Sequence, residues 1–363
     1  MTDAAMTDAA MTDGVMTDGV MTDGLTTDGV IKGVIAPRPL PRTGLVLSPL
    51  SLGTAALGER LGDGAAVNRA GVNGAGVDAA GVDAARTVDL ALASGITYVD
   101  TAPHYGIGRS ERRIGAALAR APRDTFVLST KVGRTIDEQA GTEAFDFSPD
   151  AVLSVLAGSL GRLGLSRADI VYVHDPDYAE AEARSGAFPA LAALRAEGTV
   201  RAIGAGMNQA AMLERFVLDE RLGVDVVLLA GRYTLLDPSG LRLLDLCRER
   251  GVGVVLGGVF NSGILADPRP GASYDYRQAP DHLVTRAIAL RRACERHGVP
   301  LMAAALQFGW GHPAVVSVLN GAASPAELSA NLGHATTVIP AACWEQFRSD
   351  GLIPPEVPVP GEL

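Results

Sequence analysis

Short apolar runs alternate along the chain with longer segments in which apolar residues recur every three or four positions. Eight short runs have the length and composition of buried strands, at residues 51–55, 96–100, 126–132, 169–174, 200–205, 224–230, 252–256 and 315–319. The longer segments predict amphipathic helices at residues 84–94, 110–121, 186–197, 208–221, 239–250, 282–297, 301–309 and 324–332, with another after Ser148. This alternation predicts an α/β fold, a single (β/α)8 TIM barrel.

Turn and capping residues refine this prediction. Ser110 and Ser148 precede helical patterns and are predicted N-caps. Residues 35–42 are proline-rich and are predicted to be extended, and two short strand-like runs lie on either side of Pro49. Residues 62–83 are rich in glycine, alanine and valine and predict an expanded loop before the first helix.

The first 30 residues are pentapeptide repeats such as MTDAA and MTDGV, which are small, acidic and without aromatic residues. Such a segment cannot bury enough apolar surface to order itself. We therefore expect a disordered tail at residues 1–36 and one barrel domain at residues 37–363. Deleting residues 1–30 is expected to leave activity and melting temperature unchanged, and a clear loss of either would show that the repeats have a structural role.

Composition narrows the class of protein further. Hydrophobic residues make up 47% of the chain, and its net charge of −10 argues against nucleic acid as a main partner. No apolar run approaches the roughly 20 residues of a membrane span, and the acidic N-terminus lacks the order of a secretory signal. Three widely spaced cysteines favour a reducing compartment without a structural disulfide or zinc site. The expectation is a cytoplasmic enzyme.

Polar residues follow the ends of three consecutive predicted strands. Asp100 ends one strand and Tyr105 lies five positions later in a loop; His174 ends another. Lys131 lies inside an apolar run, where an unpaired charge is costly, in a chain whose other lysine is Lys32 and which otherwise uses arginine. The carboxyl ends of parallel barrel strands meet on one face, so the four side chains are predicted to share a site.

These residues carry a resemblance to a known family. Asp100, Tyr105, Lys131 and His174 have the order, spacing and context of the catalytic tetrad of aldo-keto reductases. Residues 95–115, GITYVDTAPHYGIGRSERRIG, resemble the first signature of that family. The resemblance extends from about residue 41 to about residue 350 and implies a nicotinamide-dependent oxidoreductase with a barrel fold. It also implies that the two runs around Pro49 form a small hairpin and the first barrel strand.

The resemblance also implies roles for the four residues. Tyr105 would exchange a proton with the substrate oxygen, and His174 would orient that oxygen. A tyrosine has an ordinary pKa of about 10, and the ammonium of Lys131 is expected to lower the pKa of Tyr105. Asp100 would hold Lys131 in place. His104 is expected to line the substrate pocket or to face solvent.

The same resemblance points to cofactor contacts in three loops. Asn208 resembles the residue that binds the nicotinamide carboxamide, and the run after the seventh strand resembles the loop around the pyrophosphate. The last loop and helix suit the adenosine phosphate. The implied contacts are Asn208, Phe260, Asn261, Ser262, Gly263, Leu265, Gly321, Ala322, Ala323, Glu327 and Asn331. No GxGxxG follows the first strand, so a Rossmann site is not expected.

Departures from the family pattern bear on the cofactor. Gly257 stands where many members carry an aromatic residue that stacks on nicotinamide, and Ala230–Gly231 stand where a glutamine is common. Members specific for NADP carry Arg or Lys in the last loop, whereas this loop has Ala322, Ala323 and then Glu327. A carboxylate disfavours a second anion, so NAD is predicted, with NADP as the alternative.

Four motifs resemble one branch of the family, that of L-fucose, galactose and D-threo-aldose 1-dehydrogenases, which also includes pyridoxal 4-dehydrogenase. They are APHYGIGRSERRIG at residues 102–115, IGAGMN at 203–208, GRYTLLD at 231–237 and VFNSGIL at 259–265. The implied reaction is oxidation of an aldose's anomeric hydroxyl to a lactone. Arg232 and Tyr233 are expected to shape the site or to have a structural role, and residues 266–281 are the predicted lid. The expected partner is a small sugar or aldehyde, without nucleic acid or membrane, and the protein is expected to be a monomer or a small homo-oligomer.

Three other readings stay open. A general aldehyde or ketone reductase using NADPH would share the tetrad and differ in direction and cofactor. A non-enzymatic barrel that retains nucleotide binding is a second alternative, which an intact tetrad disfavours. A metal-dependent hydrolase would require converging ligands such as His-x-His, and the chain has no such motif; no metal is therefore expected.

Overall fold

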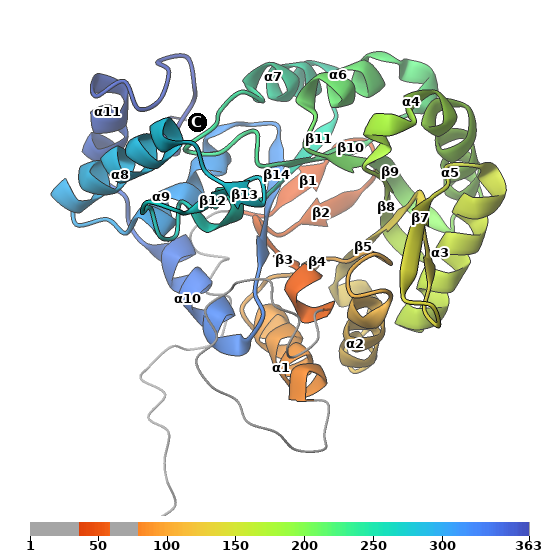
Figure 1. Cartoon of the computed structure of the whole chain (residues 1–363). Coiled ribbons are helices and arrows are strands. Elements are labelled where there is room, and N and C mark those ends of the chain that lie inside the picture. Colours follow the sequence, from red (N-terminus) through yellow and green to blue (C-terminus); the bar gives the residue numbers. More distant parts are fainter. Residues whose placement is uncertain (1–35, 59–78, 363) are drawn as a thin grey trace, which may run out of the picture.

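The computed structural model describes residues 36–58 and 79–362. The predicted tail therefore lies outside the described residues apart from Ala36, and so does most of the predicted loop at residues 62–83. Within the described part, eight parallel strands form a closed barrel in chain order. They are β3 (Leu50–Gly53), β4 (Tyr98–Asp100), β5 (Val127–Val132), β8 (Ala168–His174), β9 (Val200–Met207), β10 (Val226–Ala230), β11 (Gly253–Gly257) and β14 (Val315–Gly321). The predicted (β/α)8 barrel is confirmed (Figure 1).

Helices surround the barrel and cover its outer face (Figure 1). The longer ones are α1 (Ala79–Ala93), α2 (Arg109–Leu118), α3 (Pro149–Leu163), α5 (Phe188–Ala196), α6 (Ala210–Leu218), α7 (Leu241–Arg250), α8 (Asp281–Arg296), α9 (Leu301–Phe308), α10 (Pro325–Thr336) and α11 (Ala341–Ser349). Short helical turns are η1 (Ala55–Gly58), η2 (Arg123–Thr125), η3 (Pro176–Tyr178), α4 (Glu180–Glu182), the π-helix η4 (Ala183–Ala187), η5 (Glu220–Leu222), η6 (Asn261–Gly263) and η7 (Gly309–Gly311). In the described residues, no helix combines the length and apolar character needed to cross a membrane.

Side chains alternate between two cores because successive strand residues point to opposite faces. One core lies between the strands and the helices, and contains residues such as Val99, Leu128 and Val171. The other lies inside the barrel and includes Tyr98 and Tyr172. The residues two positions further along these strands, toward the carboxyl end, therefore also point inward.

A two-stranded hairpin closes the end of the barrel at which the strands begin. It pairs β1 (Arg38–Leu40) with β2 (Leu45–Leu47) and lies in the distant part of the view in Figure 1. Leu40, Leu45 and Leu47 pack with the inner core of the barrel. The Arg38 guanidinium donates hydrogen bonds to the carbonyls of Trp310, His312 and Val315, at 3.0, 3.1 and 2.6 Å.

The hairpin begins earlier than its sequence indicated. Its first strand lies within the proline-rich segment, which was predicted only to be extended. Pro39 is tolerated because this is an edge strand with a single partner. Gly253 at the start of β11 admits the hairpin, since a Cβ there would lie only 2.3 Å from Leu40 Cδ1.

Two helix starts differ from the predictions. Helix α1 begins at Ala79, so the last five residues of the predicted loop are helical. Ser110 was wrongly predicted as an N-cap, because helix α2 begins at Arg109 after Gly108 in a left-handed conformation. The Ser110 hydroxyl instead donates to the Thr54 carbonyl at 2.9 Å. The prediction for Ser148 is confirmed, as its hydroxyl accepts the Ala151 N–H at 3.3 Å.

Two small hairpins and one helix were not predicted. The side hairpin, residues 134–145, pairs β6 (Arg134–Asp137) with β7 (Thr142–Phe145) directly after β5. The strap, residues 266–281, contains β12 (Ser273–Tyr274) and β13 (Arg277–Gln278). Helix α11 follows α10 and packs on α8. Both hairpins connect a barrel strand to its helix, so they lie at the end of the barrel where the strands finish.

Candidate active site

The four predicted residues lie together at the carboxyl ends of β4, β5 and β8. Lys131 Nζ donates to Asp100 Oδ2 at 2.6 Å, to the Thr101 carbonyl at 3.0 Å and to the Tyr105 hydroxyl at 3.1 Å. The rings of Tyr105 and His174 meet edge to face, with their centroids 6.2 Å apart. An ammonium, a phenol and an imidazole therefore converge on one point.

The loop that carries Tyr105 is fixed by a close backbone approach. Gly106 has φ of +65°, and a Cβ there would lie 2.0 Å from the Gly58 carbonyl oxygen. A Cβ on Gly58 would lie 2.6 Å from the Tyr105 carbonyl oxygen. Glycine at both positions lets the turn η1 pack directly against this loop, which sets the position of the phenol.

Lys131 and Asp100 form a buried ion pair, with 3% and 0% of their side chains exposed. Burial alone would lower the pKa of Lys131, but the charges of Asp100 and Tyr105 outweigh it and the pKa is raised. Lys131 is therefore a cation at every pH at which the enzyme would work. This pairing removes the cost of a buried lysine that the sequence raised.

The pKa of Tyr105 departs from the sequence prediction. Burial raises this pKa above its ordinary value, and the opposing effect of Lys131 does not fully compensate it. The ammonium does stabilise the phenolate, as predicted, but the net shift is upward. Sequence alone could not weigh the two effects, because the degree of burial depends on how the loop folds. Tyr105 is a neutral phenol at neutral pH.

His174 is held as a neutral ring. Burial lowers its pKa well below the ordinary value, and the positive charges of Lys131 and Arg134 act in the same direction. Its Nδ1 is buried without a hydrogen-bond partner among the described residues, while Nε2 lies 3.6 Å from Asp175 Oδ2. The carboxylate favours the tautomer with the proton on Nε2, so this nitrogen can donate to a substrate oxygen.

A polar layer beneath the site supports Asp100. Ser129 donates to Asp100 Oδ1 at 2.6 Å, and the Tyr98 hydroxyl lies 3.0 Å from Ser129 Oγ and 3.1 Å from the Tyr172 hydroxyl. Each of these residues precedes a predicted site residue by two positions on the same strand. We did not predict this layer, although the two-residue period of a strand is the signal that would have found it.

The floor of the site beside the tetrad is made of small residues. Ala230 and Gly257 end the neighbouring strands β10 and β11, and a Cβ on Gly231 would lie 3.5 Å from Asn261 Nδ2 and 3.9 Å from Asn208 Nδ2. Asn208 Nδ2 donates to the Ala230 carbonyl at 3.1 Å, and its amide oxygen makes no hydrogen bond to another described residue. Asn208, the residue predicted to bind the nicotinamide carboxamide, therefore borders a floor without bulky side chains.

The loop after β11 contains five of the predicted cofactor contacts. Asn261 is buried and its amide bridges two loops, donating to the Gly231 carbonyl at 3.0 Å and accepting from Thr234 at 2.6 Å. Leu265 is wholly buried in the outer core, so only its backbone is available for the predicted contact with a cofactor. Phe260 is partly buried against the same core. Ser262 and Gly263 remain at the surface of the loop.

The loop after β14, residues 321–324, contains no basic residue that could pair with a 2′-phosphate. Ser324 is the N-cap of α10, and its hydroxyl accepts the Glu327 N–H at 3.2 Å. Glu327 Oε2 accepts the Ala323 N–H at 2.8 Å. Asn331 donates to the Gly321 carbonyl at 3.4 Å. Asn320 Nδ2 is buried with no partner among the described residues, and this orphaned donor would suit an acceptor of a bound nucleotide. Ala322 is buried beside it.

The strap is tied to the loop after β10. Arg232 donates to both carboxylate oxygens of Asp275, at 3.0 and 2.5 Å. The Tyr274 hydroxyl donates to Asp237 at 2.7 Å, and the Tyr276 N–H donates to Ser262 Oγ at 3.1 Å. The predicted lid is therefore a hairpin whose tip lies against the candidate cofactor loop, and Arg232 holds it there. Tyr233 is instead buried in the core.

Replacing Arg232 with Ala is expected to release the strap and to weaken cofactor binding about tenfold, mainly through faster dissociation. The reason is the loss of charged hydrogen bonds that hold the strap tip beside Ser262. Stopped-flow release of the bound dinucleotide measures it. Arg269→Ala is the matched control, since its pair with Asp267 is exposed within the same strap (61% and 63%). Equal dissociation rates in the two variants would show that the strap does not retain the cofactor.

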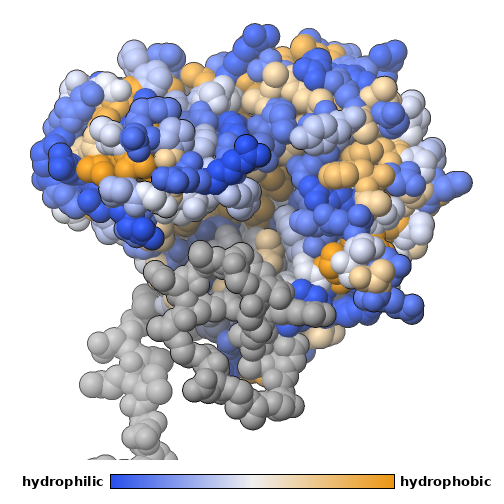
Figure 2. Space-filling view, viewed as in Figure 1, coloured by the Kyte–Doolittle hydropathy of each residue, from blue (hydrophilic) through white to orange (hydrophobic). Residues whose placement is uncertain are grey.

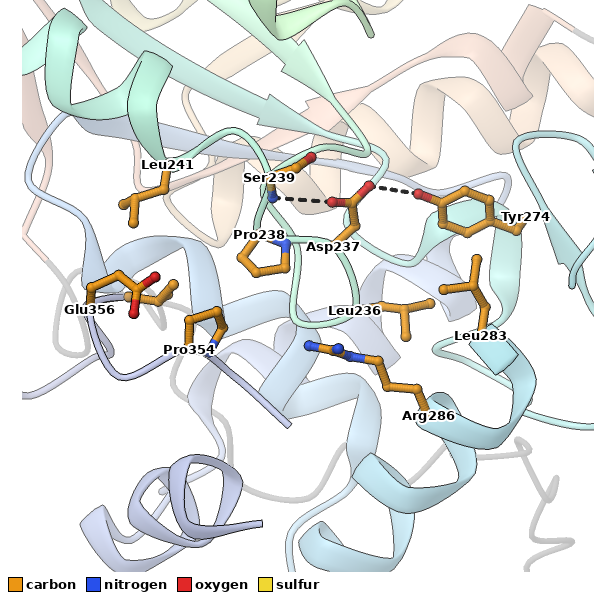
Figure 3. Close-up of a pocket in the computed structure, with 11 residues that line it drawn as sticks. Leu236, Asp237, Pro238, Ser239, Leu241, Tyr274, Leu283, Arg286, Pro354 and Glu356 are labelled. Atoms are coloured by element: carbon orange, nitrogen blue, oxygen red, sulfur yellow. Dashed lines mark hydrogen bonds between the residues drawn. The ribbon is translucent and has the colours of Figure 1, made fainter. Parts of the chain in front are cut away.

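A separate cavity of about 550 Å³ lies behind the strap. Figure 3 shows it between the loop that carries Asp237 and Ser239, the side chain of Tyr274, Arg286 of α8 and the segment with Pro354. None of the tetrad residues lines this cavity, so it is distinct from the candidate site.

On the face viewed in Figure 2, the surface is hollowed over the middle of the barrel between largely hydrophilic sides.

Among the described residues, no group of three or more His, Cys, Asp or Glu side chains could hold a metal ion.

His104 was predicted either to line the substrate pocket or to face solvent. It is partly exposed and hydrogen-bonds through Nδ1 to Glu143 of the side hairpin. It lies beside Tyr105 and His174, with ring centroids 6.1 and 6.0 Å away. The side hairpin is therefore part of the wall around the site.

The family model for the aldo/keto reductase family matches residues 50–349. The chain belongs to this family, and it is an oxidoreductase of a family that uses nicotinamide cofactors. A D-threo-aldose 1-dehydrogenase from a Pseudomonas species is 40% identical over 74% of this chain and 87% of its own length. A pyridoxal 4-dehydrogenase from Microbacterium luteolum is 39% identical over 87% of this chain and 97% of its own.

A solved structure agrees with the fold. An aldo-keto reductase from Bacillus halodurans in its holo form superposes with a TM-score of 0.66, covering 86% of this chain and 95% of its own, at 24% identity. At that identity the likeness supports the fold alone.

Proposed function

We propose that the enzyme oxidises the anomeric hydroxyl of an aldose to a lactone and uses NAD as the oxidant. The observation that carries the choice of cofactor is the carboxylate of Glu327, which accepts the Ala323 N–H in a loop without a basic residue. A 2′-phosphate there would meet a negative charge instead of an arginine. The choice of substrate is supported by the similarity to a D-threo-aldose 1-dehydrogenase.

The side chains present can carry out this reaction. Tyr105 accepts the proton of the substrate hydroxyl, and the adjacent ammonium of Lys131 stabilises the phenolate that does so. His174 donates from Nε2 to the same oxygen and orients it. Asp100 keeps Lys131 charged and in place. When bound on the small-residue floor beside Asn208, the nicotinamide supplies hydride acceptance from the substrate carbon.

The upward shift of the Tyr105 pKa predicts a steep pH dependence. Oxidation requires the phenolate, and raising the pH removes the phenol proton. Because burial raises the pKa above its ordinary value, kcat/KM for oxidation should rise roughly tenfold per pH unit through pH 7–9 without a plateau. A pH profile of initial rates at aldose concentrations well below KM measures this. A plateau near pH 8 would mean that Lys131 outweighs burial in the working enzyme.

The same pKa supports a second candidate, reduction of an aldehyde or ketone with NADPH. A neutral phenol is the form that donates a proton to a carbonyl oxygen, and Tyr105 is neutral at neutral pH. The direction of the reaction and the choice between NAD and NADPH therefore need to be tested together.

The test is formation of reduced cofactor by the purified enzyme with NAD or NADP, over a panel of L-fucose, D-arabinose, L- and D-galactose and pyridoxal. Turnover of a sugar with at least a tenfold preference for NAD would support the proposal. Turnover of pyridoxal alone would assign the other similar activity. No oxidation across the panel, together with NADPH-dependent reduction of a simple aldehyde, would overturn the proposal in favour of the reductase.

A further inference from the structure

A cluster of four polar residues connects the side hairpin to the candidate catalytic residues. His104 directly precedes Tyr105, and Asp175 directly follows His174. Arg134 and Glu143 come from β6 and β7 of the side hairpin. Arg134 pairs across the hairpin with Phe145, so Glu143, two positions away, lies on the same face. We call these four residues the hairpin cluster.

Ion pairs hold the hairpin cluster in one arrangement. Arg134 donates to Asp175 Oδ2 at 2.5 Å and to Glu143 Oε1 at 3.2 Å. Glu143 Oε2 bonds to His104 Nδ1, and the Arg134 guanidinium lies over the Phe145 ring, 4.6 Å from its centroid. Arg134 is thereby immobilised with 16% of its side chain exposed. The cluster is a rigid chain from the residue beside Tyr105 to the residue beside His174.

Asp175 adopts a backbone conformation that most residues avoid. Its φ is 45° and its ψ is 58°, in the left-handed region. Asp and Asn tolerate this region better than other residues with a Cβ, and such backbone strain is found preferentially at functional sites. The strained backbone turns its carboxylate to within 3.6 Å of His174 Nε2, the nitrogen expected to donate to the substrate oxygen.

Several polar atoms of this region have no partner among the described residues. Both contacts of the Asp175 carboxylate involve Oδ2, so Oδ1 is available to accept. His104 uses Nδ1 for Glu143, so Nε2 is available. Arg134 Nε and His174 Nδ1 are buried and unpaired. His174 itself is 92% buried, being 8% exposed. The side chains of Asp175 and His104 are 27% and 39% exposed, so a ligand can reach these acceptors beside the reacting position.

We propose that the hairpin cluster determines substrate specificity by binding the hydroxyl groups next to the reacting carbon. A substrate oxygen between Tyr105 and His174 lies beside His104, whose ring centroid is 6.1 and 6.0 Å from theirs. The Asp175 carboxylate and His104 Nε2 accept hydrogen bonds, which matches a vicinal hydroxyl and not an apolar chain. This inference deepens the proposed function and depends on it only for naming the substrate an aldose.

The test compares substrates that differ by the vicinal hydroxyl. For oxidation, the pair is the best aldose of the panel and its 2-deoxy analogue; for reduction, it is glyceraldehyde and propanal. The wild type should prefer the hydroxylated member of each pair. Asp175→Asn keeps the size and the tolerance for the left-handed backbone but removes the charge, and it should reduce that preference about 10- to 100-fold, the effect expected for a hydrogen bond to a charged group. kcat/KM for propanal should fall less than kcat/KM for glyceraldehyde, because the effect of Asp175 on the tautomer of His174 is common to both substrates.

Asp177→Asn is the matched control, because Asp177 lies on the same loop but bonds to Gln209 at 3.2 Å, outside the hairpin cluster. It should leave both preferences unchanged. An Asp175→Asn variant that lowers kcat/KM equally for the hydroxylated and the deoxy substrate would overturn the inference and leave a structural role. If the wild type oxidises no aldose, the proposed function fails, whereas a preference for glyceraldehyde that Asp175→Asn abolishes would still support the hairpin cluster.

Discussion

Tyr105→Phe is expected to lower kcat by about 10²- to 10⁴-fold, the range for removing a general acid or base. The change deletes a single oxygen, the one that accepts a hydrogen bond from Lys131 at 3.1 Å. It keeps the ring, its contact with His174 and the loop fixed by Gly106. Dinucleotide affinity should change less than threefold, because the ring does not depend on its hydroxyl for position. Steady-state kinetics and isothermal titration calorimetry measure the two effects.

Tyr178→Phe is the control for this prediction, since Tyr178 is 92% exposed and should show wild-type activity. Retention of more than a tenth of the activity in Tyr105→Phe would rule out Tyr105 as the residue that exchanges the proton. Loss of dinucleotide binding with the activity would instead show that the phenol holds the cofactor.

Lys131→Met should have the second large effect, on stability as well as on turnover. It leaves Asp100 buried without its cation, and breaking a buried ion pair costs about 3–5 kcal/mol of unfolding free energy. The double variant Asp100→Asn with Lys131→Met should regain most of that free energy, because no charge remains unpaired, but it should remain inactive. Denaturant unfolding and steady-state assays of the two single variants and the double variant provide the full cycle.

Arg120→Met is the comparison for stability, because its pair with Asp89 is exposed (54% and 59%) and should contribute at most about 1 kcal/mol. A double variant as unstable as Lys131→Met would show that the pair is not the source of the loss. A double variant with recovered activity would show that the ammonium is not needed to stabilise the phenolate.

The pattern of apolar positions was sufficient to predict the barrel and the group of four polar residues. The reason is geometric: parallel strands deliver their last residues to one rim, so the positions of Asp100, Lys131 and His174 follow from strand ends alone. The polar layer of Ser129, Tyr98 and Tyr172 follows from the same period and could have been inferred. Helix ends were less predictable, since Ser110 has the residue type of a cap but bonds to Thr54 on another element.

Features that depend on contacts between distant segments could not be predicted. The pKa of Tyr105 depends on how deeply its loop is buried, and the position of Leu265 depends on which core its turn faces. The link from Arg134 to Asp175 joins residues 41 positions apart, and neither lies in a motif that points to the other. The role of Arg232 likewise depends on its bond to Asp275 of the strap, which lies 43 positions further along the chain.

The hairpin β1–β2 closes the end of the barrel opposite the candidate active site. Its three leucines pack against the inner core that fills the barrel, so substrate and cofactor reach the site from the rim at which the strands end. The chain also enters the described fold on the sealed side, at Arg38. An enzyme tethered to an electrode or a bead through the hairpin side would present the rim with the candidate site to the solution. A tether on the strap or the side hairpin would instead obstruct that rim.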